Sequence, residues 1–190
     1  MKLSFEGDTG WLSEARRVDS PNFDSRPPDC QPEMIVIHGI SLPPGEYGGP
    51  WIDQLFTNSL RAEDHPYFAE IEGLEVSTHL LIRRDGELVQ FVDLFQRAWH
   101  AGRSCFEGRE ACNDYSVGIE LEGVDTEPYT DKQYAVLVDT LGFIQRHIPG
   151  LSDAAVVGHS DIAPGRKTDP GEIFDWGRIE QVARCPFKEG

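Results

Sequence analysis

The stretch 158–171, GHSDIAPGRKTDPG, carries side chains whose types and spacing suit metal chemistry. His159 offers an imidazole nitrogen and Asp169 a carboxylate oxygen, both ordinary zinc ligands, and Lys167 places a cation two residues before the aspartate. A Pro-Gly pair between the two candidate ligands prevents one continuous helix, so the chain must loop back and can bring both to one ion. Taken alone, the stretch favours a surface turn in which the histidine has no special role. The rest of the chain has to decide between this turn and a metal site.

A second histidine ends a strand in the same way. Residues 33–38 form a short apolar, β-branched run that ends at His38, and residues 154–158 form another that delivers His159. Ligands gather at the carboxyl ends of strands in open α/β sheets. His38, His159 and Asp169 would supply three protein ligands and leave a fourth position vacant, which is the composition of a catalytic zinc site.

The run 116–123 supplies candidate acid–base groups. Its residues alternate, so one face of a strand would carry Val117, Ile119 and Leu121 and the other Gly118, Glu120 and Glu122. A strand this apolar is expected to be central. Its two carboxylates then lie either near solvent at the end of the sheet or paired inside, and a carboxylate in a pocket is a general-base candidate.

The remaining elements form a scaffold for these groups. Residues 79–92 predict a β-hairpin, with Asp85-Gly86 as a type I′ turn. Residues 130–148 predict a helix that begins with a capping box and has an apolar stripe to cover the sheet. A short helix over 51–60 and a modest terminal helix over 175–183 complete the expected α/β domain.

Less regular segments flank this scaffold. Residues 1–32 are polar and rich in proline, which predicts a strap lying on the domain, and residues 33–190 then form the domain itself. Residues 39–75 predict a long, partly irregular excursion in which Tyr67 either lines a cleft or fastens the segment to the core. Trp99 and His100 lie at the end of a short predicted strand. Their side chains either bind the substrate or are buried in the core.

Composition narrows the classes of partner. A chain of 190 residues is expected to form one domain with a full core. Its net charge of −16 repels phosphate backbones and anionic lipids, which argues against nucleic acid or a membrane as a partner. A small-molecule substrate is compatible with this charge, and no feature indicates an obligate protein partner.

The sequence also indicates a compartment. Acidic residues at Glu6, Asp8 and Glu14 interrupt the N-terminal region where a signal peptide needs an apolar run, so we expect a cytoplasmic protein. The four cysteines include no C-x-x-C pair, and in a reducing compartment they are expected to be free thiols.

Several blocks of the sequence resemble a known family. They are VIHGISLPPG, HPYF, LIRRDG, RAWHAG, GREACNDYSVGIELEG, EPYTDKQY and GHSDIAPGRKTDPG. Together they are similar to the zinc amidases that act on muropeptides, in the family's order and from about Trp11 to Trp176. The resemblance implies an α/β fold with a mixed central sheet flanked by helices, as in bacteriophage amidases and peptidoglycan-recognition domains.

The resemblance also implies roles for individual residues. His38, His159 and Asp169 would bind Zn²⁺, and Glu120 and Lys167 would be the catalytic pair. Glu120 would move protons and Lys167 would face the oxyanion, with Glu122 as the alternative base. Trp99 and His100 fall in a block that lies near the sugar in relatives and would contact the substrate. Tyr67, in the 39–75 excursion, is a further candidate contact.

The implied reaction is hydrolysis of the amide between the lactyl group of 1,6-anhydro-N-acetylmuramic acid and L-alanine, during cell-wall recycling. Gly39 departs from the family pattern, because relatives often have asparagine there. Two rival functions stay open: a module that binds muropeptide without cutting it, and an amidase that acts on intact peptidoglycan in the periplasm.

Overall fold

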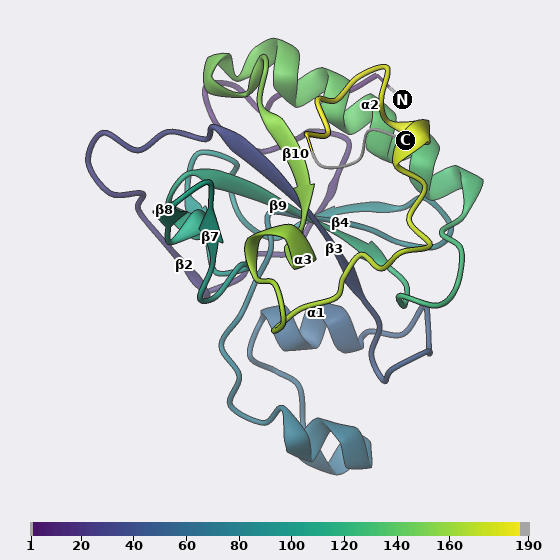
Figure 1. Cartoon of the computed structure of the whole chain (residues 1–190). Coiled ribbons are helices and arrows are strands. Elements are labelled where there is room, and N and C mark those ends of the chain that lie inside the picture. The colour runs from purple at the N-terminus through teal and green to yellow at the C-terminus, as the bar shows by residue number, and fades with distance from the viewer. Residues whose placement is uncertain (1, 187–190) are drawn as a thin grey trace.

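The chain folds around a six-stranded sheet with the order β1-β5-β4-β9-β3-β10 (Figure 1). The computed structural model describes residues 2–186, so the last four residues of the predicted 33–190 domain lie outside the described part. The strands are β1 (Arg16–Arg17), β3 (Met34–Ile40), β4 (Leu80–Ile82), β5 (Leu88–Gln90), β9 (Ser116–Glu122) and β10 (Ala155–Gly158). Only the β4–β5 pair within this sheet is antiparallel, so the sheet is mixed, as predicted.

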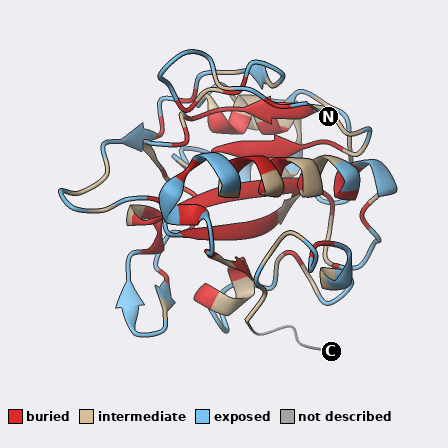
Figure 2. Cartoon of the chain, turned by 90° about the horizontal axis from the view of Figure 1, so that it is seen from above, coloured by how far each residue is buried: buried red, intermediate tan, exposed pale blue. Residues whose placement is uncertain are grey.

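Helices cover both faces of the sheet, and the alternation of each strand decides what faces them. Helix α2 (Asp131–His147) packs on one face, where Ile35, Ile37 and Ile119 join its Leu137 and Leu141 in one apolar cluster. Helix α1 (Trp51–Phe56) packs against the other face. The central strand β9 is buried from end to end between these layers, and its neighbour β3 is buried from Met34 to His38 (Figure 2). The residues of β3 and β9 that point away from α2 therefore form the floor of any site on the α1 side.

Helix α2 begins where the sequence predicts. The Thr130 hydroxyl accepts a hydrogen bond from the backbone N–H of Gln133, and the Gln133 side chain accepts one from the N–H of Thr130, which completes the capping box. The predicted helix over 51–60 is confirmed but ends at Phe56. The predicted helix over 175–183 is wrong. A single 3₁₀ turn, Trp176–Arg178, forms there, with no side-chain cap at its start and a helix-weakening Gly177 inside it.

The hairpin is confirmed, but its turn is not the predicted type I′. Arg83 and Glu87 close the loop through a backbone hydrogen bond of 2.9 Å, which leaves three residues between them. Gly86 has a φ of +91°, whereas Asp85 is not among the residues with positive φ. A three-residue hairpin loop needs only one left-handed residue, and the glycine supplies it.

Short elements complete the described chain. The N-terminal segment contributes β1, which extends the sheet beside β5, and β2 (Phe23–Asp24), which pairs with β6 (Arg97–Ala98). β7 (Cys105–Phe106) and β8 (Arg109–Glu110) form a small hairpin, and α3 (His159–Ile162) is one turn long. Further 3₁₀ turns span Ala62–Asp64, Pro66–Glu70, Cys112–Asp114 and Pro149–Leu151.

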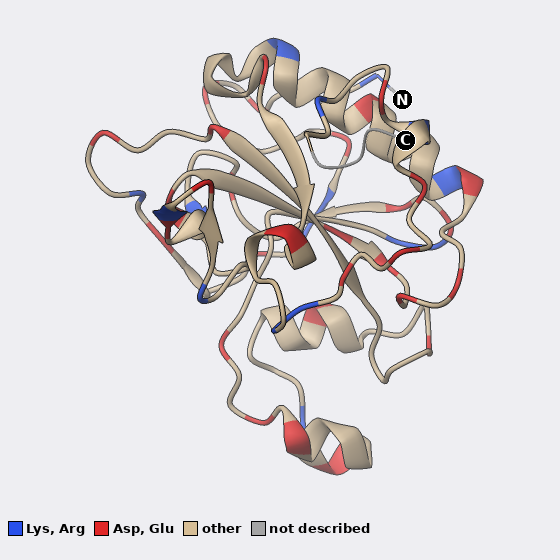
Figure 3. Cartoon of the chain, in the orientation of Figure 1, with Lys and Arg blue, Asp and Glu red and all other residues tan. Residues whose placement is uncertain are grey.

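Two surface properties bear on partners. Asp and Glu occur on many loops and helices in the view of Figure 3. None of the described helices is both long and apolar enough to cross a lipid bilayer.

All four cysteines lie in the described part, and none of them forms a disulfide, as predicted.

Candidate metal centre and its cleft

Two neighbouring parallel strands place His38 and Glu120 side by side. β3 and β9 pair in register, with His38 opposite Glu120. Residues opposite each other in a parallel ladder point to the same face, so both side chains leave the sheet on the side away from α2. Both are at least 90 % buried, with exposed fractions of 1 % and 8 %.

The loop after β10 brings the other two groups to the same place. His159 follows the last residue of β10 and begins the one-turn helix α3. The chain then returns, and the backbone N–H of Ser160 donates to the carbonyl of Asp169 at 3.0 Å. The Tyr129 hydroxyl holds the next residue by donating to the carbonyl of Pro170 at 3.0 Å. The predicted loop therefore does bring residues ten apart together.

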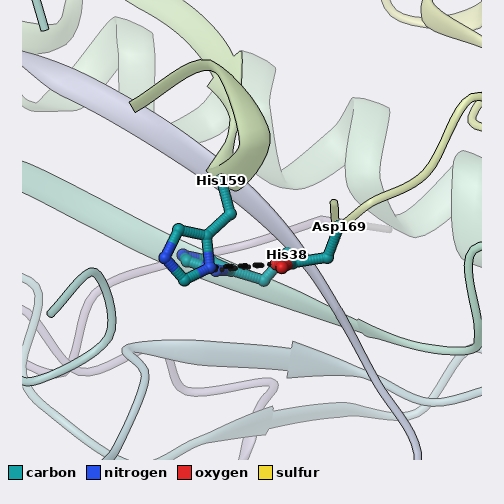
Figure 4. A group of neighbouring side chains, drawn as sticks. All are labelled: His38, His159 and Asp169. Carbon is teal, nitrogen blue, oxygen red and sulfur yellow. Dashed lines mark hydrogen bonds and ion pairs between the residues drawn. The ribbon is translucent and has the colours of Figure 1, made fainter. Parts of the chain in front are cut away.

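Three side-chain atoms converge at this point (Figure 4). Nδ1 of His38 lies 2.9 Å from Nδ1 of His159, and Oδ2 of Asp169 lies 3.2 Å and 3.1 Å from these two nitrogens. Ligands about 2.0–2.1 Å from a tetrahedral zinc ion stand about 3.3 Å from one another. The triangle is therefore close to the size that one zinc ion requires.

The imidazole rings of His38 and His159 can each present a nitrogen lone pair to a cation. Burial lowers the pKa of His38 to about 4, so the ring is neutral at pH 7. Nε2 of His159 lies 3.2 Å from the carbonyl of Ala101, which can only accept, so the proton of a neutral ring is on Nε2 and Nδ1 is bare. The bare Nδ1 of His159 and Oδ2 of Asp169 face each other at 3.1 Å and repel unless a positive charge lies beside them. His38, His159 and Asp169 thus form a group that could hold a metal ion.

Glu120 lies beside this group without a partner of its own. Its Oε2 is buried and has no hydrogen-bond partner within the described chain. Burial raises the pKa of Glu120 well above its ordinary value, the charge of Asp169 raises it further, and Lys167 opposes both. A buried carboxyl with a raised pKa and an unused oxygen is suited to exchanging protons.

The centre opens into a cleft of about 660 Å³, a size that accommodates a small molecule. His159, Asp169, Glu120 and the exposed Lys167 line it on the polar side. The 39–75 excursion supplies the apolar side, where Leu42, Leu55, Phe56, Tyr67, Ile71 and Leu74 contribute.

Family comparisons agree with this geometry. Residues 28–172 match the model of the N-acetylmuramoyl-L-alanine amidase family. The chain belongs to this family.

Individual relatives resemble the amidase over nearly its whole length. It is 58 % identical over 183 residues to the 1,6-anhydro-N-acetylmuramyl-L-alanine amidase AmpD of Salmonella typhimurium, covering 96 % of this chain and 97 % of that one. It is 57 % identical over 175 residues to AmpD of Enterobacter cloacae, with 92 % and 93 % covered. A crystal structure of a selenomethionine derivative of AmpD superimposes with a TM-score of 0.90 at 55 % identity, covering 94 % and 99 % of the two chains.

The predicted substrate contacts of the amidase fall in different places. Tyr67 lines the cleft, while its neighbour Phe68 is fully buried and fastens the excursion to the core. His100 reaches the floor of the cleft, but both of its ring nitrogens already have protein partners. Trp99 is half-buried and does not belong to the described lining of the cleft.

Glu122 has a structural environment that contrasts with that of Glu120. Its Oε1 accepts the backbone N–H of Gly48 at 2.7 Å and Nη1 of Arg83 at 3.2 Å, and its Oε2 accepts the N–H of Arg84 at 3.1 Å. This carboxylate is already satisfied and ties the loop after β3 to the hairpin. Of the two glutamates, only Glu120 is free to act on a substrate.

Gly39 gives space to a residue that sequence reasoning missed. A Cβ at position 39 would lie 2.4 Å from the hydroxyl oxygen of Tyr129, the group that holds Pro170. An asparagine there would require that hydroxyl to move. The EPYTDKQY block contains Tyr129, but its sequence pattern gives no sign that the ring reaches the loop that carries Asp169.

Proposed function

We propose that the amidase is a zinc enzyme that hydrolyses the amide between the lactyl group of 1,6-anhydro-N-acetylmuramic acid and L-alanine during muropeptide recycling. The observation that carries the proposal is the convergence of His38, His159 and Asp169 beside an unpartnered, buried Glu120. The relatives named above are amidases of this substrate by name and match over more than nine-tenths of the chain. A small anhydro-muropeptide in the cytoplasm is accordingly the proposed substrate.

The proposed metal ligands are Nδ1 of His38, Nδ1 of His159 and Oδ2 of Asp169. Two imidazoles and one carboxylate suit Zn²⁺ and leave a fourth position for water or substrate. Bound zinc supplies a water molecule of lowered pKa, about 7, and polarises the amide carbonyl. The three residues would hold the ion beside the cleft, which His159 and Asp169 line.

Glu120 is the proposed general base and acid. Its unpartnered oxygen would accept a proton from the attacking water as the new C–O bond forms. When the C–N bond breaks, the same carboxyl would pass a proton to the departing alanine nitrogen. Its raised pKa makes this carboxylate a stronger base, which favours the first of these two transfers.

Lys167 is the proposed oxyanion partner. It lines the same cleft and acts electrostatically on both Glu120 and His38. A fixed cation aimed at the carbonyl oxygen stabilises the negative charge that develops there. Tyr67, Trp99 and His100 remain proposed substrate contacts, and Tyr67 has the most direct access.

The proposal for the whole chain assigns the chemistry to residues 33–190. Residues 1–32 would act as a strap that stabilises the amidase domain from outside. Leu3 and Leu12 of this segment are buried in the cluster beneath α2, which supports a stabilising role.

Incubation with anhydro-muramyl tripeptide, followed by mass spectrometry, tests the function. The amidase should release free tripeptide, and release should stop on chelation and resume when zinc is returned. Intact sacculi serve as the comparison substrate and should be cut far more slowly. Intact anhydro-muramyl tripeptide in the presence of bound zinc would instead indicate a muropeptide-binding protein.

A further inference from the structure

A chain of hydrogen bonds runs from the proposed ligand His38 into the protein interior. Nε2 of His38 lies 2.9 Å from Nδ1 of His100. Nε2 of His100 lies 3.0 Å from the Ser116 hydroxyl, and that hydroxyl lies 2.6 Å from the carbonyl of Cys112. His38, His100 and Ser116 are all buried, so water does not compete along most of this path.

The acceptor at the end of this series of hydrogen bonds sets the direction of every hydrogen bond in the series. A carbonyl oxygen can only accept, so the Ser116 hydroxyl donates to Cys112 and its oxygen accepts from Nε2–H of His100. His100 is buried, and its ring nitrogens contact His38 and Ser116 with no carboxylate of the described chain beside them, so the ring carries one proton, on Nε2, and Nδ1 accepts. Nε2 of His38 must therefore donate. This leaves Nδ1 of His38 bare toward His159 and Asp169.

Strand β9 is built to hold this path. Ser116, Gly118 and Glu120 alternate along one face of it. A Cβ at Gly118 would lie 2.5 Å from Cγ of His100, so only glycine lets the imidazole lie directly on the strand. The same face thus carries the hydroxyl that orients His100, the space for its ring and the proposed general base.

We propose that His100, oriented by Ser116, is a positioning residue that selects the Nε2–H tautomer of His38 and so presents its Nδ1 to zinc. This inference rests on the proposed function and gives His100 a role behind the metal ligand in addition to its proposed contact with the substrate. A neutral histidine has two tautomers, and the wrong one would turn an N–H toward the ion. Hydrogen bonds behind a ligating imidazole typically change metal affinity by about 10–100-fold.

Two substitutions at one position separate hydrogen bonding from packing. His100→Phe keeps a ring but removes the acceptor, whereas His100→Asn removes the ring but can keep a carbonyl oxygen near the place of Nδ1. In competition with a chromogenic chelator, His100→Phe should bind zinc about 10–100-fold more weakly than the parent. His100→Asn should stay closer to the parent. The reverse order, with Phe tight and Asn weak, would show that His100 only fills space and would overturn the inference.

The tautomer can be read without any substitution. Long-range ¹H–¹⁵N NMR of the full chain, zinc-free and zinc-loaded, distinguishes a protonated from a bare ring nitrogen. His38 should carry its proton on Nε2 in both states, and Ser116→Ala should let the Nδ1–H form appear in the zinc-free protein. A parent His38 protonated on Nδ1 in the zinc-free protein would overturn the inference even if the variants do not fold.

Failure of the inference is distinguishable from failure of the function. A parent protein that binds zinc and cleaves substrate, while His100→Phe binds zinc as tightly, would refute only the positioning role. A parent protein that takes up no zinc would refute the proposed function, and the positioning role with it.

Discussion

Glu120 and Glu122 form a matched pair for a decisive substitution experiment. They lie two residues apart on one face of β9, and both are buried. Glu120 has an oxygen with no hydrogen-bond partner in the described chain, whereas Glu122 accepts three N–H donors, one of them from the buried Arg83 guanidinium. Replacement of each by glutamine should therefore have opposite consequences for turnover and for stability.

Glu120→Gln should remove the proton acceptor and lower kcat by about 10²–10⁴-fold. It should also raise the stability of the zinc-free protein at neutral pH. The pKa of Glu120 is higher in the folded chain than in the unfolded chain, so its contribution to stability is lost as pH rises through the folded value. The advantage of the glutamine variant should accordingly grow with pH and vanish in acid.

Glu122→Gln should have the opposite effects: it should lower the stability of the protein and leave kcat nearly unchanged. Arg83 keeps its ion pairs with Asp53 and Glu87, so the main loss is in the hydrogen bonds that Glu122 accepts, which costs about 1–3 kcal/mol of unfolding free energy. For a chain of this size, 1 kcal/mol moves Tm by about 2–4 °C, so Tm should fall by roughly 2–12 °C. The turnover number, measured well below the new Tm, should stay close to that of the parent because the proposed reacting groups are untouched.

The assay pairs tripeptide release with calorimetric Tm for the parent and both variants. A folded Glu122→Gln protein with no turnover, beside an active Glu120→Gln protein, would refute the assignment of the base. A Glu120→Gln protein that is inactive and also strongly destabilised would refute the view that this carboxylate is held without partners.

Further predictions concern the groups around the centre. Lys167→Met should lower kcat by about 10²-fold, with zinc affinity unchanged in a chelator competition, because an oxyanion partner acts mainly in the transition state. A parallel loss of zinc would contradict that role. The kcat/KM of the parent should fall with decreasing pH as Glu120 takes up a proton, because its protonated form cannot accept one from the attacking water; the residual activity of Glu120→Gln should lack that limb. Tyr129→Phe should cost about 1–3 kcal/mol in chemical denaturation, because it leaves the Pro170 carbonyl without its buried donor, and should weaken zinc binding through the neighbouring Asp169. Unchanged zinc affinity in that variant would mean that the loop holds its position unaided.

Much of the framework could be predicted because it depends on local patterns. The apolar runs that end at His38 and before His159, the alternation of 116–123 and the capping box at Thr130 each point to one element. Once two buried strands end in histidines, the topology of an α/β sheet brings those side chains to one edge. The convergence of His38, His159 and Asp169 could be anticipated on that basis.

Other features depend on tertiary contacts that no local pattern reports. A 3₁₀ turn replaces the predicted terminal helix, and hydrogen bonds from Asp175 to Tyr134 and from Arg178 to Asp131 join this segment to α2. The edge strand β1 forms where it pairs with β5. Ser116 and Tyr129 escaped notice since a hydroxyl acquires its role from whatever the fold places beside it. Glu120 and Glu122 are equivalent in the strand pattern, and only their neighbours distinguish them.

Titration of the zinc-free amidase with Zn²⁺, while tripeptide release is followed, tests the central claim most directly. Activity should rise in proportion to added zinc and reach its plateau at one ion per chain. X-ray absorption at the zinc edge should then show two imidazole nitrogens and a carboxylate oxygen among the ligands. Full cleavage by the zinc-free protein, or activity that does not follow zinc uptake, would contradict the proposed role of His38, His159 and Asp169.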